Sequence, residues 1–187
     1  SYTKGSVRLN GKEIHCKSPH EAIELGIALI SENRKEEGIL PNFDNKDNIS
    51  LASMKKYMSG IVINDDKKKR NALEKGKQVG LKPNDPAFMT VSLSGGNAQK
   101  VILARWMSTD ATVMIFDEPT KGIDIGAKAD IYLLMEKMAA EGIAIIMVSS
   151  ELTEVMGMSD RILVMSDGKI TGELMKDEFS EESILNY

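Results

Sequence analysis

Cysteine and long apolar runs are both scarce in this chain of 187 residues. One cysteine, Cys16, cannot form an internal disulfide, and the opening residues do not read as a secretory leader, so we expect a reducing compartment. The longest apolar run, residues 143–148, is far shorter than the roughly 20 residues that a membrane-spanning helix needs. The net charge of -4 gives no electrostatic reason to expect nucleic acid as the main partner.

A phosphate-binding loop of the GxxxxGK[ST] type is also missing. In such a loop the backbone amides wrap the phosphates and a hydroxyl reaches magnesium. Residues 5–13 come nearest, but five residues separate the two glycines and Glu13 follows the lysine, where a carboxylate would repel a phosphate. The Asn10-Gly11 pair predicts a hairpin turn there instead. The chain therefore has no phosphate loop of its own.

The composition is that of a globular protein. With 42% hydrophobic side chains, the chain can build one sizeable core, or one core with a smaller lobe. It opens at Ser1 without an initiator methionine, so we expect a fragment of a longer protein.

Short apolar runs alternate with helical patterns through the second half of the chain. This alternation predicts an α/β fold with a parallel sheet covered by helices. A further buried strand is expected at residues 27–30, and Asp167-Gly168 predicts a hairpin. The other expected strands are residues 113–116, 143–148 and 162–165, and the expected helices are residues 125–140, 151–156 and 180–185.

The middle of the chain is polar and then helical. Residues 31–48 are rich in turn formers, and residues 49–82 predict helix up to the break at Pro83. The basic run at residues 67–70 follows two aspartates and has no aromatic residues between its charges, so we interpret it as a solvated helix face.

An acidic pair, Asp117-Glu118, comes directly after the apolar run at residues 113–116. Both carboxylates are therefore expected at the carboxyl edge of the sheet, where open parallel sheets bind ligands. One carboxylate there can hold magnesium through water, and its neighbour can polarise an attacking water. An acidic strand exit alone is common, so the pair carries weight only with its neighbours.

The stretch LSGGNAQK, residues 93–100, places glycines at the expected start of a helix. Glycines there can form an ordinary turn. The amino end of a helix also exposes unpaired amides with a partial positive charge, and Ser94 can cap it or donate to an anion.

LSGGNAQK, a helix through Arg105-Trp106, and then VMIFDEPTKGID closely resemble the signature, Walker B and D-loop series of the ATP-binding cassette ATPases. The resemblance covers nearly the whole chain. It implies a P-loop NTPase domain that lacks its Walker A strand, loop and helix, with an antiparallel β part and a helical subdomain. The implied divisions are residues 1–30 for the β part and a core strand, 31–48 for the Q-loop region, 49–110 for the helical subdomain with the signature, and 111–187 for the α/β core.

Finer features are similar to the second cassette of the bacterial simple-sugar importers of the ribose, galactose and xylose type. They are the segments SENRKEEGI, DIGAK and SSEL and the signature variant with Asn97. In those importers one polypeptide carries two fused cassettes. The chain resembles the carboxyl-terminal cassette, beginning after the phosphate loop and its helix.

The resemblance implies a role for each site residue. Asp117 would lie beside Mg²⁺, Glu118 would be the general base, and Asp124 would be the D-loop aspartate at the interface between cassettes. Two cassettes sandwich ATP head to tail in this family, so the signature would contact the γ-phosphate of a nucleotide held by the opposite cassette. The candidate residues for that contact in trans are Leu93, Ser94, Gly95, Gly96, Asn97 and Gln99.

Two positions depart from the family pattern. Glu32 stands where the Q-loop glutamine is usual, and Ser150 stands at the position of the switch histidine. The histidines of the chain, His15 and His20, lie in the amino-terminal region and are expected to be surface side chains. Ser150 can cap the helix that follows it, but its hydroxyl cannot replace an imidazole, so we expect weak turnover at the site that Asp117 and Glu118 line.

The resemblance implies the ATP-hydrolysing motor of a sugar importer at the cytoplasmic face of the bacterial membrane, with ribose or a galactoside as the expected sugar. The implied partners are a fused upstream cassette, membrane-spanning permease subunits and a periplasmic or lipoprotein sugar-binding protein. ATP and Mg²⁺ are the implied cofactors. The fragment alone is expected to be inactive and to self-associate through an exposed sheet edge.

Two other classes stay open. The first is a soluble cassette ATPase acting on DNA or ribosomes, which the acidic net charge disfavours. The second is a degenerate cassette that only scaffolds a partner, which the intact LSGG and DEP sequences disfavour.

Overall fold

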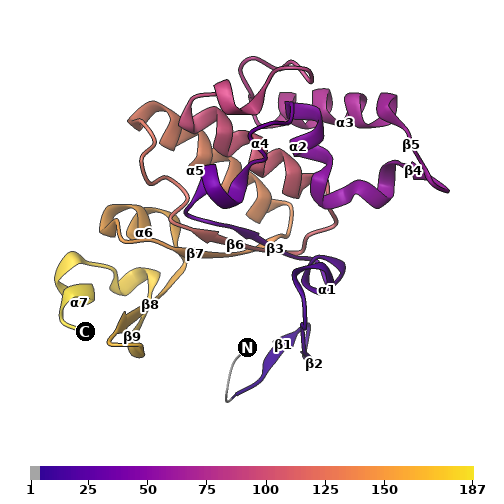
Figure 1. Cartoon of the computed structure of the whole chain (residues 1–187). Coiled ribbons are helices and arrows are strands. Elements are labelled where there is room, and N and C mark those ends of the chain that lie inside the picture. The colour runs from indigo at the N-terminus through magenta and orange to yellow at the C-terminus, as the bar shows by residue number, and fades with distance from the viewer. Residues whose placement is uncertain (1–4) are drawn as a thin grey trace.

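A three-stranded parallel sheet is the centre of the molecule (Figure 1). The structure is a computed structural model and describes residues 5–187. Strands β3 (Ile27–Ile30), β6 (Val113–Asp117) and β7 (Ala144–Val148) lie in the order β3-β6-β7. Both pairings are parallel, which confirms the predicted sheet type. Their β-branched and apolar residues suit strands of this kind.

Helices cover one face of this sheet. Helices α4 (Gly95–Met107) and α5 (Ile125–Ala140) lie on the same side of the strands in Figure 1. Ile30, Met114 and Phe116 point into that layer and are at most 1% exposed. These side chains and the inner residues of the two helices form the main hydrophobic core.

The opposite face of the sheet is exposed. Leu29, Ile115 and Ile146 stand side by side across the three strands in register. Leu29 is 54% exposed and Ile146 is 52% exposed, in contrast to their neighbours on the covered face. Parallel sheets are normally covered on both faces, so this apolar surface is unusual for the fold.

The helical part is interrupted where the sequence predicts one continuous helical region at residues 49–82. Helix α2 (Asn45–Ser50) passes into a 3-10 helix, η2 (Leu51–Tyr57), and the chain then forms the hairpin of β4 (Met58–Ser59) and β5 (Val62–Ile63) before α3 (Asp65–Gln78). The prediction of continuous helix is therefore wrong. The reason is local, because Gly60 adopts a positive φ of 63° and the β-branched residues after it favour strand.

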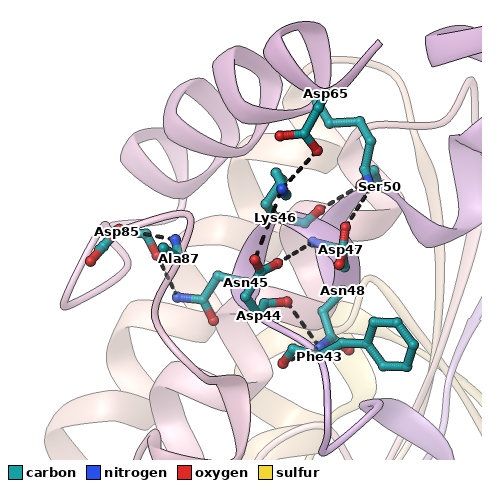
Figure 2. A network of polar contacts seen from close by, with 11 residues as sticks. Phe43, Asp44, Asn45, Lys46, Asp47, Asn48, Ser50, Asp65, Asp85 and Ala87 are labelled. Atoms are coloured by element: carbon teal, nitrogen blue, oxygen red, sulfur yellow. Dashed lines mark hydrogen bonds and ion pairs between the residues drawn. The ribbon is translucent and has the colours of Figure 1, made fainter. Parts of the chain in front are cut away.

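A buried polar network holds α2 in place. Asn48 is fully buried, its side-chain amide donates to Thr90 Oγ1 at 3.1 Å, and Thr90 Oγ1 donates to Asn45 Oδ1 at 2.9 Å. Arg105, on α4, donates to Asn48 O at 2.7 Å and to Asn48 Oδ1 at 3.1 Å. Burial lowers the pKa of Arg105 to about 10. Figure 2 shows two further contacts of these residues, in which the Asn45 side-chain amide donates to Asp85 O and the Asn48 side-chain amide donates to Phe43 O.

Two ion pairs join α2 to α3. Lys46 Nζ lies 2.7 Å from Asp65 Oδ1, as Figure 2 shows, and Lys68 pairs with Asp47. Lys68 is 6% exposed, so the interpretation of residues 67–70 as a solvated face is wrong for this lysine. Its stem is buried between the helices while Asp47 satisfies its charge.

The carboxyl-terminal part forms a separate small layer. Helix α6 (Leu152–Met158) precedes the antiparallel pair β8 (Arg161–Ser166) and β9 (Lys169–Met175), which confirms the predicted hairpin. Within the described residues β8 pairs with β9 and not with the parallel sheet. The expectation that residues 162–165 continue the parallel alternation is therefore wrong, because these residues pack in their own cluster with α7 (Glu181–Leu185).

The remaining elements are short. Their bounds are β1 (Val7–Leu9), β2 (Lys12–Ile14), α1 (Pro19–Glu24), the π-helix η1 (Arg34–Gly38) and the 3-10 helices η3 (Thr90–Ser92) and η4 (Lys176–Glu178).

No helix in the described part of the chain has the length and apolarity to cross a bilayer.

Candidate functional site

The ends of β6 and β7 bring the acidic pair beside Ser150. The backbone N–H of Glu118 donates to Val148 O at 2.9 Å, and Glu118 Oε1 accepts from the Ser150 N–H at 2.8 Å. Glu118 adopts a positive φ of 48°, a region that side-chain-bearing residues occupy sparsely. These two hydrogen bonds hold the residue in that conformation, and such strain is concentrated at functional sites.

Ser150 does not cap the helix after β7, so that expectation is wrong. The cap position of α6 is Glu151, and the hydroxyl that binds its N–H is that of Ser149, at 3.0 Å. The reason is that the helix begins at Leu152 and not at Glu151, so Ser150 lies one residue before the cap position. The Ser150 N–H donates to the Glu118 carboxylate across the sheet edge. Ser150 thus meets the acidic pair through its backbone, which is independent of the side chain at this position.

A buried carboxylate lies behind the acidic pair. Glu154, on α6, is 4% exposed, and its Oε1 accepts from Thr120 Oγ1 at 2.8 Å. Its other oxygen accepts from the Ser149 hydroxyl. Glu154 therefore ties the loop after β6 to the loop after β7. The sequence analysis missed it, and the available signal was its place one helical turn after Ser150.

The Q-loop position lies next to the same loop. Glu32 Oε1 is 2.6 Å from the ammonium of Lys121, three residues after Glu118. The hydrogen bond with Glu32 is the main cause that raises the pKa of Lys121, and the charges of Glu118 and Asp117 raise it further. Arg34 donates to the backbone carbonyl of Lys121. Sequence reasoning did not predict either contact.

The signature forms the amino end of α4, as predicted. Ser94 is the N-cap residue, and its hydroxyl accepts from the Asn97 N–H at 3.5 Å and from Asn97 Nδ2 at 3.1 Å. A Cβ on Gly96 would lie 2.7 Å from Ala127 Cβ, so only glycine allows α4 and α5 to approach this closely. Ser94 and Gly95 are exposed.

The signature residues do not all face the surface. Leu93 packs against the core, and Gln99 is 1% exposed with its Oε1 buried and without a partner in the described residues. The surface offered at this helix end is therefore made by Ser94 and Gly95, with half-buried Asn97 beside them. Asp124 caps α5 close by, where its carboxylate accepts from the Ala127 N–H at 3.0 Å.

The chain thus carries two separate sets of candidate residues. Asp117, Glu118 and Ser150 meet at the sheet edge, whereas Ser94 and Gly95 lie at the start of α4. In the described residues no hydrogen bond or ion pair joins one set to the other. Each set resembles half of a site, and neither contains a phosphate loop.

The fold is that of an ATP-binding cassette. The solved structure of the ATP-binding cassette MJ1267 matches with a TM-score of 0.80 at 21% identity, over 98% of this chain and 76% of that one. The family model described as ABC transporter matches residues 1–121. The chain belongs to the ABC transporter family, which confirms the resemblance.

Curated relatives are sugar-import proteins by name. A protein of Rhizobium etli named for ribose/galactose/methyl galactoside import is 48% identical over 97% of this chain and 34% of its own length. The arabinose import ATP-binding protein AraG of Pseudomonas savastanoi pv. phaseolicola is 47% identical over 98% of this chain and 36% of its own length. This chain therefore spans about a third of the length of the curated relatives it matches.

Proposed function

We propose that the chain is part of the ATP-hydrolysing subunit of a simple-sugar importer, corresponding to its carboxyl-terminal cassette, with ribose or a galactoside as the sugar. The observation that carries this proposal is Glu118, whose carboxylate is held by the Ser150 N–H at 2.8 Å at the carboxyl end of β6. The names of the relatives support the substrate class. The structural similarity to the solved cassette, at 21% identity, supports the fold alone.

Glu118 is the proposed general base. A base must be fixed where it can take a proton from water, and Glu118 has both its backbone and its side chain fixed by hydrogen bonds to the end of β7. It is half-buried, so one carboxylate oxygen is anchored while the side chain keeps access to solvent. Ser150 supplies no imidazole, so this site would lack a second group that orients water.

Asp117 fits a magnesium ligand. Its carboxylate is half-buried at the end of β6, and hard oxygen donors are the ligands that Mg²⁺ prefers. In the described residues no group of three or more His, Cys, Asp or Glu side chains could hold a metal by itself. Asp117 would therefore hold the ion together with phosphate oxygens and water, and the ion would offset negative charge on the phosphates.

Ser94 and Gly95 fit a phosphate contact in trans. They are exposed at the start of the 13-residue helix α4, where unpaired N–H groups and the helix dipole favour an anion. The acidic pair of the same chain lies outside hydrogen-bonding reach of this helix end. We therefore propose that the phosphate belongs to ATP held by a second cassette, with Asp124 at the interface between the two.

The exposed sheet face supports a missing phosphate-loop segment. Leu29 and Ile146 form an apolar row that a parallel sheet normally covers with helices. A strand beside β7 and a helix across this face would cover it and would carry the Walker A loop. We propose that the parent protein supplies both, together with a second cassette.

The proposed partners follow from the same assignment. They are membrane-spanning permease subunits, which residues 31–48 and the helical part would contact at the cytoplasmic face, and a sugar-binding protein outside the membrane. The exposed apolar side chains of the β4–β5 hairpin, including Ile61 at 95% exposed, belong to this helical part.

Substitution in the full-length protein tests the two half-sites. Ser94→Arg should abolish ATP hydrolysis coupled to transport, because the signature would complete the stronger site on the first cassette. Glu118→Gln should reduce it only partly, because this chain's own site is the weaker one. Ser92→Arg, at the exposed residue directly before the signature, is the matched control and should stay near wild type. Equal and complete loss for Ser94→Arg and Glu118→Gln would contradict the asymmetry.

The chain alone should bind ATP poorly because it lacks the main phosphate cradle. We expect a Kd no tighter than about 1 mM by isothermal titration with Mg²⁺ present. Micromolar affinity would contradict this assignment.

A further inference from the structure

Lys121 is held at both its side chain and its backbone by the segment after β3. Its ammonium lies 2.6 Å from Glu32 Oε1, and its carbonyl oxygen accepts from the Arg34 guanidinium. The two partners come from about 90 residues earlier in the chain, so the contacts arise only in the folded protein. They join the Q-loop region to the loop between Glu118 and Asp124.

The charges around Lys121 are unusual. Glu32 places a carboxylate where the family pattern has a neutral glutamine, on the same side as Asp117 and Glu118, whose charges both act on Lys121. Without Lys121, three carboxylates would share the edge where a nucleotide's phosphates are expected. Lys121 supplies the positive charge that pairs with the carboxylate added by Glu32.

The Glu32–Lys121 ion pair is also exposed, and the neighbouring Arg34 side chain has a nitrogen without a hydrogen-bond partner in the described part of the chain. Glu32 is 40% exposed and Lys121 is 60% exposed, and such ion pairs contribute little to folding stability. Arg34 Nη1 is buried and has no hydrogen-bond partner among the described residues, which disfavours this arrangement of the segment. A contact of this kind contributes more to positioning the two segments than to the stability of the fold.

We propose that Lys121 is a positioning residue whose ion pair with Glu32 couples residues 31–38 to the loop that carries Glu118 and Asp124. This inference rests on the proposed function. Lys121 stands three residues after Glu118 and three before Asp124, so fixing it fixes the loop from the candidate base to the interface aspartate.

The test is a double-mutant cycle in the full-length protein assembled with its permease. Lys121→Met should lower sugar-stimulated ATP hydrolysis by about tenfold, because Glu32 then adds its charge to the acidic pair, and Glu32→Gln should lower it less. The double variant E32Q/K121M should recover only to the level of Glu32→Gln, because the uncompensated charge is gone but the ion pair is still absent. The charge-swapped variant E32K/K121E should also recover part of the loss.

A second readout separates positioning from folding and from activity itself. Lys121→Met should weaken binding of a fluorescent ATP analogue with Mg²⁺ by several-fold, and the double variant should match Glu32→Gln. The matched control is the pair Glu24–Lys55, also exposed and 2.7 Å long but outside the site. Lys55→Met should leave both readouts near wild type.

Two failures are distinguishable. A wild-type assembly that does not hydrolyse ATP would overturn the proposed function. An active wild type in which the effects of Glu32→Gln and Lys121→Met simply add in the double variant would overturn the coupling through Lys121. Equal losses for Lys55→Met and Lys121→Met would overturn it as well.

Discussion

The helical part around α2 and the parallel sheet differ in how their buried groups are satisfied. Around α2, buried Asn45, Asn48 and Thr90 bond to one another, and Arg105 of α4 bonds to Asn48. In the sheet, Ile30 is fully buried, while Leu29, the residue before it in the same strand, is 54% exposed. The buried polar groups around α2 thus have partners within the chain, whereas the sheet is covered on one face.

This difference marks the face that the proposed upstream segment would cover. Buried polar groups are costly unless they are paired, and those around α2 have their partners in the chain. An exposed apolar sheet face is costly until something covers it. The acidic pair lies at the edge of that incomplete sheet, so the residues proposed for chemistry sit in the part of the fold that needs completion.

The largest expected effect comes from the two faces of β3. Ile30→Ala should lower the free energy of unfolding by about 3–4 kcal/mol, because it leaves a cavity in the core, whereas Leu29→Ala should cost below about 1 kcal/mol. Urea unfolding of the chain measures both. Similar losses for the two variants would contradict an open face, and a larger loss for Leu29→Ala in the full-length protein would show that the face is covered there.

Removing Arg105, the cation of the network around α2, should lower the free energy of unfolding by less than Ile30→Ala does. Arg105→Met removes the Arg105 donor to the carbonyl of buried Asn48 and one of the two donors to its Oδ1, which keeps the Leu40 N–H, and we expect a loss of about 2 kcal/mol in unfolding free energy. Lys69→Met, at an exposed position of α3, is the control and should change stability by under about 0.5 kcal/mol. A loss no larger than that of the control would show that the hydrogen bonds from Arg105 do not stabilise the network around α2.

Self-association should report on the open face. Ile146→Lys places a charge in the middle of the apolar row and should shift the chain toward monomer in sedimentation equilibrium, with an association constant at least about tenfold weaker. Leu133→Lys is the control, since Leu133 is 65% exposed on α5, away from this row. A wild-type chain that stays monomeric at high concentration would contradict self-association altogether.

The smallest effect is a pH dependence in the helical part. The hydrogen bond from Lys46 is the main cause that lowers the pKa of Asp65 below its ordinary value. A lowered pKa means that the stabilisation is present above the unfolded-state pKa of about 4 and is lost as the pH falls through the lower folded-state value. Asp65→Asn should therefore lower the urea midpoint slightly at pH 7, and this difference should shrink under acid conditions.

Asp66→Asn is the control for that measurement, because Asp66 lies in the same first turn of α3 and carries the same interaction with the helix dipole. A difference between wild type and Asp65→Asn that persists unchanged at pH 2 would contradict the assigned cause.

Much of the sheet and of the signature could be predicted from local pattern. Short apolar runs predicted the parallel strands, and Ser94 before two glycines indicated the N-cap of α4. The hairpin at residues 58–63 was missed because a single positive φ at Gly60 overrides the surrounding helical pattern. The burial of Lys68 was missed because it depends on Asp47, a residue of another helix.

The site shows the same division. The order of LSGGNAQK and DEPTKGID by itself determined the family and the candidate residues, because each motif is a short local arrangement that its own residue types produce. Only the tertiary structure decided that Glu118 is held by the Ser150 N–H, that Glu154 is buried behind it, and that Lys121 meets Glu32. The two residues of each contact lie between 32 and 89 positions apart in the chain. No local pattern encodes which distant side chain will stand opposite another once the strands align.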